Sequence, residues 1–384
     1  MKKIKDPDAL PASIEFLLIP LINLILAFFV AGVVVLLIAE NPFHAIGYLF
    51  LGAFGSLEGF GYTLYYATSF IFAGLAVGLA FQGKLFNIGG EGQGLMGGIG
   101  ATLVVLAFDH TLPAYILLPL AIIAAAAFGA IWGLIAGWIQ AYRNGHIVIT
   151  TIMLNFIAAG ILSYLLANFL KKPGGSTETR EFLASGQVPS FIEPINKLFP
   201  NAYYSAPLNW SFILALILCA VYWWYVWHTK WGYQLRAVGQ NEEASLYAGI
   251  NSKKQILITM LISAAFAGLI AINVILGETH SLKPNFVFGA GFTGIAVALM
   301  GRNHPVGIVF AAILFGALQQ GGTELQFNIQ RISPYFVYML MGLVVFFSGA
   351  LAYQFYPFFL KRFPNKRFMK PQSQPATTEA KKGA

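Results

Sequence analysis

Charged side chains are scarce in this 384-residue sequence, where Asp, Glu, Lys and Arg make up 10% of the residues. A soluble domain carries about 25% charged residues, so a water-soluble globular protein of this length is excluded. Cysteine is almost absent, and a single residue, Cys219, permits neither an intrachain disulfide nor a CxxC metal site. The six histidines are scattered and form no HExxH pair, so no metal site and no catalytic constellation is expected.

Hydrophobic residues, in contrast, make up 58% of the chain and gather in long runs. Several runs reach the roughly 20 residues that a helix needs to cross about 30 Å of hydrocarbon. The first run is too long for a signal peptide and lacks a small-residue cleavage site, so we expect it to be retained. The sequence predicts an all-α, polytopic membrane protein. Ten helices are expected, over residues 16–39, 62–81, 86–107, 114–139, 147–169, 208–228, 254–276, 286–300, 304–319 and 332–353.

The distribution of Lys and Arg predicts the orientation, because cytoplasmic loops are enriched in these residues. Of the 23 basic residues, 17 fall on the side that includes both chain ends. We therefore expect both termini in the cytoplasm, in agreement with an even number of helices. The formal net charge of +8 then lies beside anionic lipid, and no nucleic-acid partner is expected. The basic residues on the other side are Lys171, Lys172, Arg180, Lys197, Lys283 and Arg331.

The membrane domain is expected over residues 16–353, after a cytoplasmic N-terminus of residues 1–15. A long outward-facing loop, residues 170–207, is rich in Pro, Gly and Ser. It serves either as a docking surface or lid, or only as a connection with a short surface helix. The cytoplasmic tail, residues 354–384, becomes poor in apolar residues and is expected to be disordered.

A second long loop, residues 229–253, lies on the predicted cytoplasmic side. Asn241 can cap a short helix, and Glu242 and Glu243 in its first turn suit the helix dipole. Gly249 can end the helix. Three apolar residues are expected on one face: Leu246, Tyr247 and Ile250. The amphipathic pattern favours docking into a partner's groove, because the alternative, an interfacial helix, would turn an acidic face toward anionic headgroups.

The stretch FNIGGEGQGLMGGIGA, residues 86–101, places polar groups inside a predicted membrane helix. Asn87, Glu91 and Gln93 are costly in hydrocarbon, so we expect them to face a cavity or a partner. For Glu91 the sequence leaves two roles open: a place in the substrate path, or a structural role in which it caps a broken helix or binds backbone amides. Asn155, in the run TTIMLNFIA, is either a substrate contact or part of an interhelical hydrogen bond.

A second glycine-rich segment, NFVFGAGFTGIAVALMG at residues 285–301, follows in the other half of the chain. Both segments contain GxGxxG, but neither lies in the soluble strand-to-helix unit that binds dinucleotides. Short, glycine-interrupted segments in the two halves instead indicate helices broken along a transport path. The glycines assigned to helix breaks and close packing are Gly89, Gly90, Gly92, Gly94, Gly289, Gly291 and Gly294.

Four blocks of sequence together resemble a known family. They are FNIGGEGQGLMGG, TIMLNFIA, RAVGQNEEASLYAGIN and GFTGIAVALMGRNHPVGIVFAAILFGALQQGG. In this order and spacing they resemble the permease subunits of ATP-binding-cassette importers, in the branch that includes ribose-type sugar permeases. Within that branch the similarity is greatest to nucleoside permeases paired with basic membrane lipoproteins. The resemblance covers about Tyr62 to Ala352 and implies a type II importer-like fold.

The resemblance gives the cytoplasmic helix a role as a coupling helix with an EAAxxxG-like motif, in which Ser245 replaces the commoner alanine. The residues it assigns to ATPase coupling are Gly239, Asn241, Glu242, Glu243, Ala244, Leu246, Tyr247, Gly249 and Ile250. It implies a cytoplasmic ATPase dimer that binds the ATP, a second, similar permease subunit and an extracytoplasmic substrate-binding lipoprotein. This chain itself would be no enzyme and hold no cofactor.

The resemblance implies transport of nucleosides across a bacterial inner membrane, with a ribose-like sugar or another small polar solute as the alternative. A different class, the ion-coupled secondary transporter, would need acidic residues within the membrane for coupling. Glu91 alone is a small supply of such acidic residues. The four candidates for the substrate path are Asn87, Glu91, Gln93 and Asn155.

Overall fold

The computed structural model describes residues 19–38, 40–174, 177–199, 204–333 and 335–347. Over these ranges no strand forms, and the one bridge pairing joins Ser190 to Asn209. Seven described helices are long and apolar enough to cross a membrane, which confirms the predicted all-α, polytopic membrane fold. The expected cytoplasmic N-terminus, residues 1–15, and tail, residues 354–384, lie outside the described residues.

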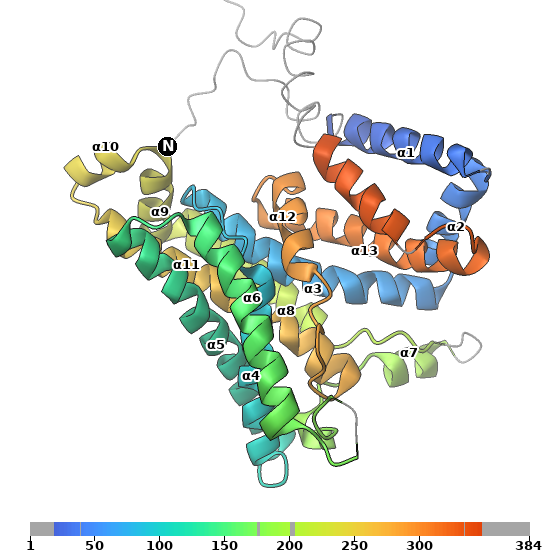
Figure 1. Cartoon of the computed structure of the whole chain (residues 1–384), viewed down its shortest axis with the longest axis horizontal. Helices are drawn as coiled ribbons and strands as arrows, with labels where there is room; N and C mark the ends of the chain where they lie inside the picture. The colour runs from blue at the N-terminus through green and yellow to red at the C-terminus, as the bar shows by residue number, and fades with distance from the viewer. Residues whose placement is uncertain (1–18, 39, 175–176, 200–203, 334, 348–384) are drawn as a thin grey trace, which may run out of the picture.

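The first four long spans follow one another along the chain, and shorter helices separate the later ones (Figure 1). The spans are α3 (Leu57–Gln82), α4 (Gly90–Phe108), α5 (Ala114–Arg143), α6 (Ile147–Leu165) with the π-helical turn η2 (Leu166–Leu170), α8 (Ser211–His228), α11 (Ser252–Gly268) with the π-helix η4 (Ile272–Thr279), and α13 (Pro305–Asn328). The shorter apolar helices are Leu24–Leu37 within α1 (Ile19–Leu37), α2 (Pro42–Phe54), α12 (Ala290–Met300) and a final helix, Tyr335–Phe347. Outside the spans lie η3 (Ala184–Gly186), α7 (Ile192–Leu198), α9 (Lys230–Gln240) and α10 (Glu242–Tyr247).

Each of the ten predicted segments contains a helix, but α2 was not predicted. Asn41 caps α2 by accepting a hydrogen bond from the Phe43 amide at 2.9 Å, and Pro42 occupies its first turn. Its 13 residues extend about 20 Å, less than the roughly 30 Å of hydrocarbon. A search for runs of about 20 apolar residues therefore misses it, although the expected fold of about ten membrane helices is otherwise present as long spans and shorter apolar helices.

Helix α13 also corrects the prediction, because it continues to Asn328 and not to residue 319. The added turns contain the polar sequence QQGGTELQFN, which reads as the end of a membrane helix. Gly321, Gly322 and Leu325 are nevertheless buried, and this part of α13 packs against α2. Packing against a neighbouring helix stabilises these turns where the local sequence does not.

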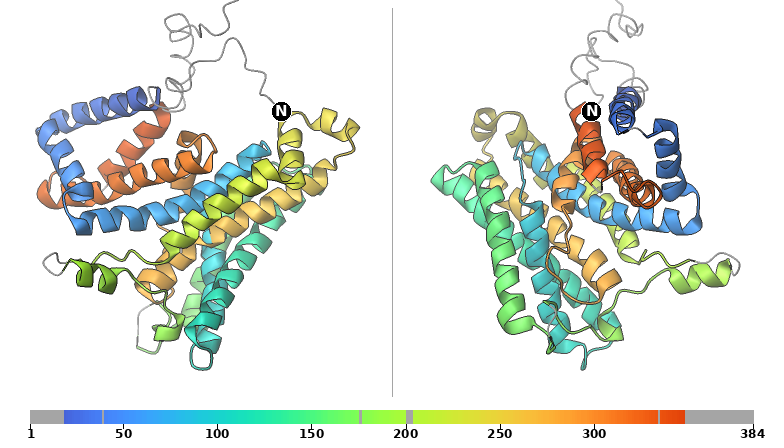
Figure 2. Two further views of the ribbon diagram at one scale, coloured as in Figure 1. Left: turned by 180° about the vertical axis from the view of Figure 1, so that it is seen from behind. Right: turned by 45° about the vertical axis from the view of Figure 1, so that its right-hand side comes forward.

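Helices α3 and α11–η4 form the centre of the protein. In their most apolar stretches 83% and 78% of residues are buried, against 28% in α5, α6 and α8. Helix α11 packs along α5 and α3, while α3 also packs against α12 and α13. Figure 2 shows α3, α8 and α11 running side by side through the molecule. The outer faces of α5, α6 and α8 remain exposed and apolar, as lipid-facing helices require.

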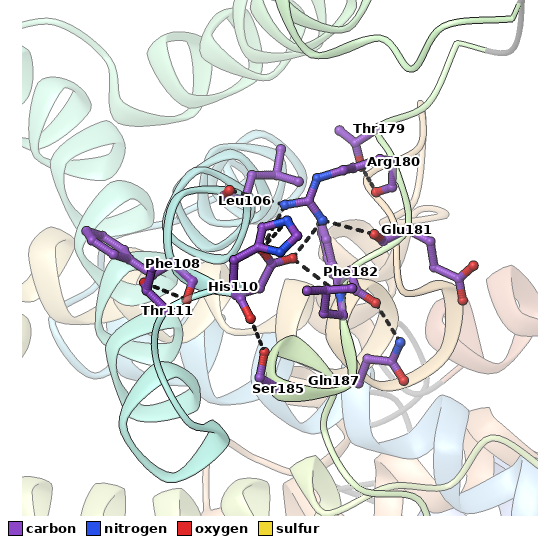
Figure 3. A network of polar contacts seen from close by, with 12 residues as sticks. Leu106, Phe108, His110, Thr111, Thr179, Arg180, Glu181, Phe182, Ser185 and Gln187 are labelled. Atoms are coloured by element: carbon purple, nitrogen blue, oxygen red, sulfur yellow. Dashed lines mark hydrogen bonds and ion pairs between the residues drawn. The ribbon is translucent and has the colours of Figure 1, made fainter.

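The long loop is fastened to the end of α4 by one ion pair (Figure 3). The Arg180 guanidinium donates to both oxygens of Asp109, at 2.7 and 2.8 Å, and to the Leu106 carbonyl. The Leu183 amide also donates to this carboxylate, and Ser185 Oγ donates to the Asp109 carbonyl at 2.6 Å. The hydrogen bonds from Arg180 lower the pKa of Asp109, although burial acts in the opposite direction.

The Asp109 carboxylate should make the stability of this loop depend on pH. Because its pKa is lowered in the folded protein, the stabilisation is complete above the unfolded value of about 3.9 and is lost as pH falls below it. We expect the thermal unfolding midpoint in detergent to fall between pH 5 and pH 2.5 in the wild type. The Asp109→Asn variant should lack this part of the dependence, and an identical pH profile would contradict the assignment.

Arg180→Ala should destabilise the loop by about 1–2 kcal/mol at pH 7, because it leaves a buried carboxylate without its cation. Arg180 is 38% exposed, so solvent screening keeps the effect below that of a fully buried pair. Hydrogen exchange at the Phe182 and Val188 amides measures the loss. The matched control is Lys172→Gln, in the exposed Lys172–Glu178 pair of the same loop, which should cost less than about 0.5 kcal/mol.

Candidate functional site: a polar, aromatic cavity and an exposed cytoplasmic helix

A cavity of about 300 Å³ lies between the central helices α3 and η4, the start of α12, α13 and the final helix. This volume is at the lower end for sites that hold small molecules. Its walls mix aromatic rings with a few polar groups, as such sites do. The polar side chains are Tyr65, Tyr66, Ser69, Glu278, Thr293, Gln319 and Tyr338.

Aromatic rings cover one side of the cavity. The rings of Tyr65 and Tyr66 lie 5.3 Å apart in an edge-to-face arrangement, and Phe70 follows one turn later on α3. Phe286 and Phe288 contribute from the segment before α12, where Phe288 is exposed. Flat aromatic walls of this kind suit a planar, unsaturated ring in a ligand.

Asn273 fixes the two helices that carry most of the polar groups. Its side chain is fully buried and donates to the Tyr65 carbonyl at 3.0 Å and to Ser69 Oγ at 2.9 Å. The Asn273 Oδ1 atom accepts from Asn209 and from Ser211. These bonds hold η4 against α3. The π-helical geometry of η4 is rare and is frequent at functional sites.

Glu278, five residues after Asn273 on η4, accepts a hydrogen bond from the Tyr65 hydroxyl. None of the ion pairs recorded among the described residues includes Glu278. The carboxylate therefore stands in the wall of the cavity with a neutral donor as its protein partner.

Glu91 lies beside the cavity, in the first turn of α4 and at the N-terminus of α12. Its two oxygens accept from the Gly289 and Gly291 amides, at 3.0 and 3.1 Å. The Ala290 amide donates to the Val287 carbonyl and the Phe292 amide to the Gly289 carbonyl, so the first amides of α12 all have acceptors. The structure thus shows the second of the two roles left open, binding of backbone amides at a broken helix.

The two glycine-rich segments meet at this point. A Cβ atom added at Gly291 would overlap the backbone of Gly90 and Glu91, so only glycine lets α4 and α12 come this close. Gly289 has a φ of +75°, which glycine adopts without strain, and it turns the chain into α12. The predicted helix break at Gly289 and the close approach at Gly90 and Gly291 are therefore present.

The other glycines assigned to this region also lie at close contacts. Gly92 packs on Asn155, Gly94 on Val287 and Gly294 on Ala73 of α3. Gly89 is the N-cap residue of α4, beside the Asn87 and Gln93 side chains.

Asn87, Gln93 and Asn155 make their hydrogen bonds around the start of α4, and none of them lines the cavity. Asn87 and Gln93 bond to each other, and Asn87 also bonds to Ser263 of α11. Asn155 of α6 accepts from the Gly92 amide at 2.9 Å and donates to the Ile88 carbonyl at 2.9 Å. All three are buried. For Asn155 the interhelical hydrogen bond is thus present, and none of the four predicted path residues lines the cavity.

The residues that do line the cavity were not predicted from the sequence. The clearest overlooked signal is Glu278, an acidic residue in the run AINVILGETH, which the predicted end of the helix at residue 276 placed in a loop. The structure keeps it within a helix because η4 continues α11 to Thr279. Tyr65, Tyr66 and Ser69 carried no signal that separates them from ordinary membrane-helix residues.

The cytoplasmic helix predicted within residues 229–253 is α10, which projects at one end of the molecule (Figure 1). Asn241 caps it by accepting from the Ala244 amide at 3.0 Å. Glu242, Glu243 and Ala244 are exposed, and Leu246 and Tyr247 are 64% and 96% exposed. Gly249 follows with a φ of +77° and ends the turn.

Two features of this loop differ from the prediction. Ile250 is buried and lies beyond the end of α10, so it does not share an exposed face with Leu246 and Tyr247. A second helix, α9, precedes α10, and its buried Gly239 packs on the Gln82 carbonyl at the end of α3. Ser245 is buried and donates to the Asn241 carbonyl. Because the position is buried, it requires a small residue, and serine meets that requirement in place of the commoner alanine.

Glu91→Gln should weaken the junction of α4 and α12 by about 1–3 kcal/mol, because the amide keeps one acceptor oxygen and turns an NH₂ group toward a backbone amide. Thermal unfolding of the purified protein measures the loss. The matched control is Glu193→Gln, an exposed acid in the first turn of α7, which should shift the midpoint little. Equal midpoints for Glu91→Gln and wild type would contradict the capping role.

Comparisons with known proteins place the chain in a family. The model of the "Branched-chain amino acid transport system / permease component" family matches residues 59–349. The guanosine ABC transporter permease protein NupP of Bacillus subtilis is 39% identical over 344 residues, which cover 89% of this chain and 96% of that protein.

Two further relatives share the same level of identity with this chain. The nucleoside ABC transporter permease protein NupB of Lactococcus lactis is 32% identical over 333 residues, covering 86% of this chain and 90% of that protein. The glucose ABC transporter permease protein TsgB13 of Haloferax volcanii is 32% identical over 333 residues, covering 85% of this chain and 86% of that protein. No solved structure matches. The extent of the family match and these identities show that the chain belongs to the branched-chain amino acid transport system permease component family, as a multi-pass membrane subunit of a transporter.

Proposed function

We propose that this chain is a permease subunit that forms the membrane path of an ATP-driven importer for nucleosides. The observation that carries the proposal is the 39% identity to a guanosine permease along nearly the whole of both chains. The cavity supports it, because a nucleoside has a planar base for the aromatic wall and a polar sugar for the hydroxyl, amide and carboxylate groups.

In this proposal the energy comes from a separate ATPase that docks on α10. The helix offers an exposed Leu246 and Tyr247 and an acidic first turn, features of a surface that contacts a partner. Beside it a hollow of about 300 Å³ includes Lys230 and Lys254, which suit an acidic group of the partner. ATP would bind to the ATPase, and this chain would hold neither cofactor nor metal and bind no nucleic acid.

The other partners follow from the same class. A second, similar permease would complete the path, and a lipoprotein outside the membrane would deliver the substrate to the end that carries residues 170–188. The chain would lie in a bacterial plasma membrane with both termini in the cytoplasm, as the distribution of Lys and Arg predicts.

A simple sugar is the second candidate substrate. The glucose permease relative is as similar to this chain as the Lactococcus nucleoside relative, at 32% identity over 333 residues each. The aromatic wall favours a nucleoside, although pyranose rings also pack on aromatic side chains.

The test is purification from the native membrane in mild detergent, followed by mass spectrometry and ligand binding. We expect an ATPase and a second permease to co-purify, and the cognate binding protein to bind nucleosides more tightly than ribose or glucose. Recovery of the chain alone, under conditions that preserve other membrane complexes, would contradict the importer class. Preference of the binding protein for sugars would select the second candidate.

Tyr247→Ala and Glu243→Lys should uncouple the importer. Removing the most exposed large side chain of α10, or reversing a charge in its first turn, should weaken ATPase binding by about 1–3 kcal/mol and lower uptake accordingly. Membrane insertion should be unchanged. The control is Tyr115→Ala, 78% exposed at the start of α5. Normal ATP-driven uptake in both α10 variants would rule out this docking site.

A further inference from the structure

Among the described residues that line the cavity, one side chain is charged, the carboxylate of Glu278. Asn273 already holds η4 against α3, because its buried amide bonds to the Tyr65 carbonyl and to Ser69. Glu278 is exposed on the cavity wall, and the Tyr65 hydroxyl is its one recorded partner among the described residues. A carboxylate placed beside hydrocarbon is costly and is kept where a ligand uses it.

The geometry leaves most of this carboxylate free. Two carboxylate oxygens offer about four acceptor positions, and Tyr65 occupies one of them. The remaining positions can accept hydrogen bonds from a neutral ligand that carries neighbouring hydroxyl groups. The cis-diol of a ribose presents two such donors side by side, and an acidic side chain is the group that proteins use for ribose hydroxyls in dinucleotide sites.

The other walls are arranged to hold the rest of such a ligand. Tyr66, whose ring packs edge-to-face against Tyr65, offers a flat surface for a base, and base stacking on aromatic side chains tolerates different bases. Gln319 of α13 contributes an amide, which can both donate to and accept from a base edge. Carboxylate, aromatic ring and amide thus come from three different helices around one space.

Building on the proposed function, we propose that Glu278 is a specificity residue that binds the ribose hydroxyls of a nucleoside in the cavity. Tyr65 is its positioning residue, because the hydroxyl of Tyr65 orients the carboxylate while Asn273 fixes the backbone of both helices. Glu91 has a different role, because its two oxygens are already bonded to the amides of α12.

The test compares a ribonucleoside with its 2′,3′-dideoxy analogue in ATP-driven uptake by the complete importer in proteoliposomes. Both are supplied at saturating concentrations of loaded binding protein, so that the selectivity of that protein cancels when a variant is compared with the wild type. Glu278→Gln should lower ribonucleoside uptake by about tenfold or more, the loss expected for hydrogen bonds to a charged group. Uptake of the dideoxy analogue, which lacks both hydroxyls, should change by less than about twofold.

Three further variants sharpen the result. Tyr65→Phe should also reduce the ratio of ribonucleoside to dideoxynucleoside uptake, but by less than Glu278→Gln does, since the carboxylate remains. The control is Glu324→Gln, on the same helix as Gln319 but outside the cavity, which should leave the ratio unchanged. If Glu278→Gln does not assemble, Glu278→Asp keeps the charge and withdraws the oxygens by one methylene, and the same loss of ratio is expected.

The outcomes separate the two proposals. If the wild-type importer takes up no nucleoside, the proposed function fails. If it takes up nucleosides and Glu278→Gln keeps the wild-type ratio within about twofold, the role of Glu278 is wrong while the function stands.

Discussion

A helix that begins inside a membrane protein must find acceptors for its first amides, and Glu91 provides them for α12. The N-termini of α4 and α12 meet at Gly90 and Gly291, so two positive helix ends face each other with one carboxylate between them. The carboxylate satisfies two amides and lowers the repulsion of the two dipoles at once. Without it, the segment that carries Phe286 and Phe288 would lose its anchor, and the wall of the cavity with it.

The proposed mechanism links the cytoplasmic helix to the cavity through one continuous element. Helix α10 ends five residues before α11 begins, and α11 continues through η4 to the position of Glu278. Because α11–η4 is among the most buried elements, a displacement at α10 is passed to tightly packed neighbours and not absorbed by lipid. ATP-driven movement of α10 would therefore alter the cavity through rigid-body motion of packed helices.

The sequence predicts the elements whose signals are local. Apolar runs located ten helices, and Asn241 marked the start of α10. The spacing of Gly90 and Gly94 indicated close helix packing, which the structure shows against Gly291 of α12 and against Val287 just before that helix. The carboxylate of Glu91 was placed correctly at a broken helix, but its acceptor role for amides 198 and 200 residues away depends on the tertiary fold.

The rest could not be read from the chain because it depends on packing between distant segments. Helix α2 is too short to show as a membrane run, and the polar turns of α13 are stable only against α2. The sequence pattern placed Ile250 on one apolar face with Tyr247, but Ile250 is buried after the chain turns at Gly249. The cavity combines residues of α3, η4 and α13, and no periodicity relates Tyr65 to Glu278 and Gln319.

The central claim is that nucleosides pass through the cavity between α3, η4 and α13, and a structure of the assembled importer trapped with a nucleoside tests it most directly. The account predicts ligand density in that cavity, with the ribose at Glu278, the base beside Tyr66, and Glu91 still bonded to the amides of α12. Ligand density beside Glu91 or Asn155, or a cavity filled by the second permease subunit, would contradict it.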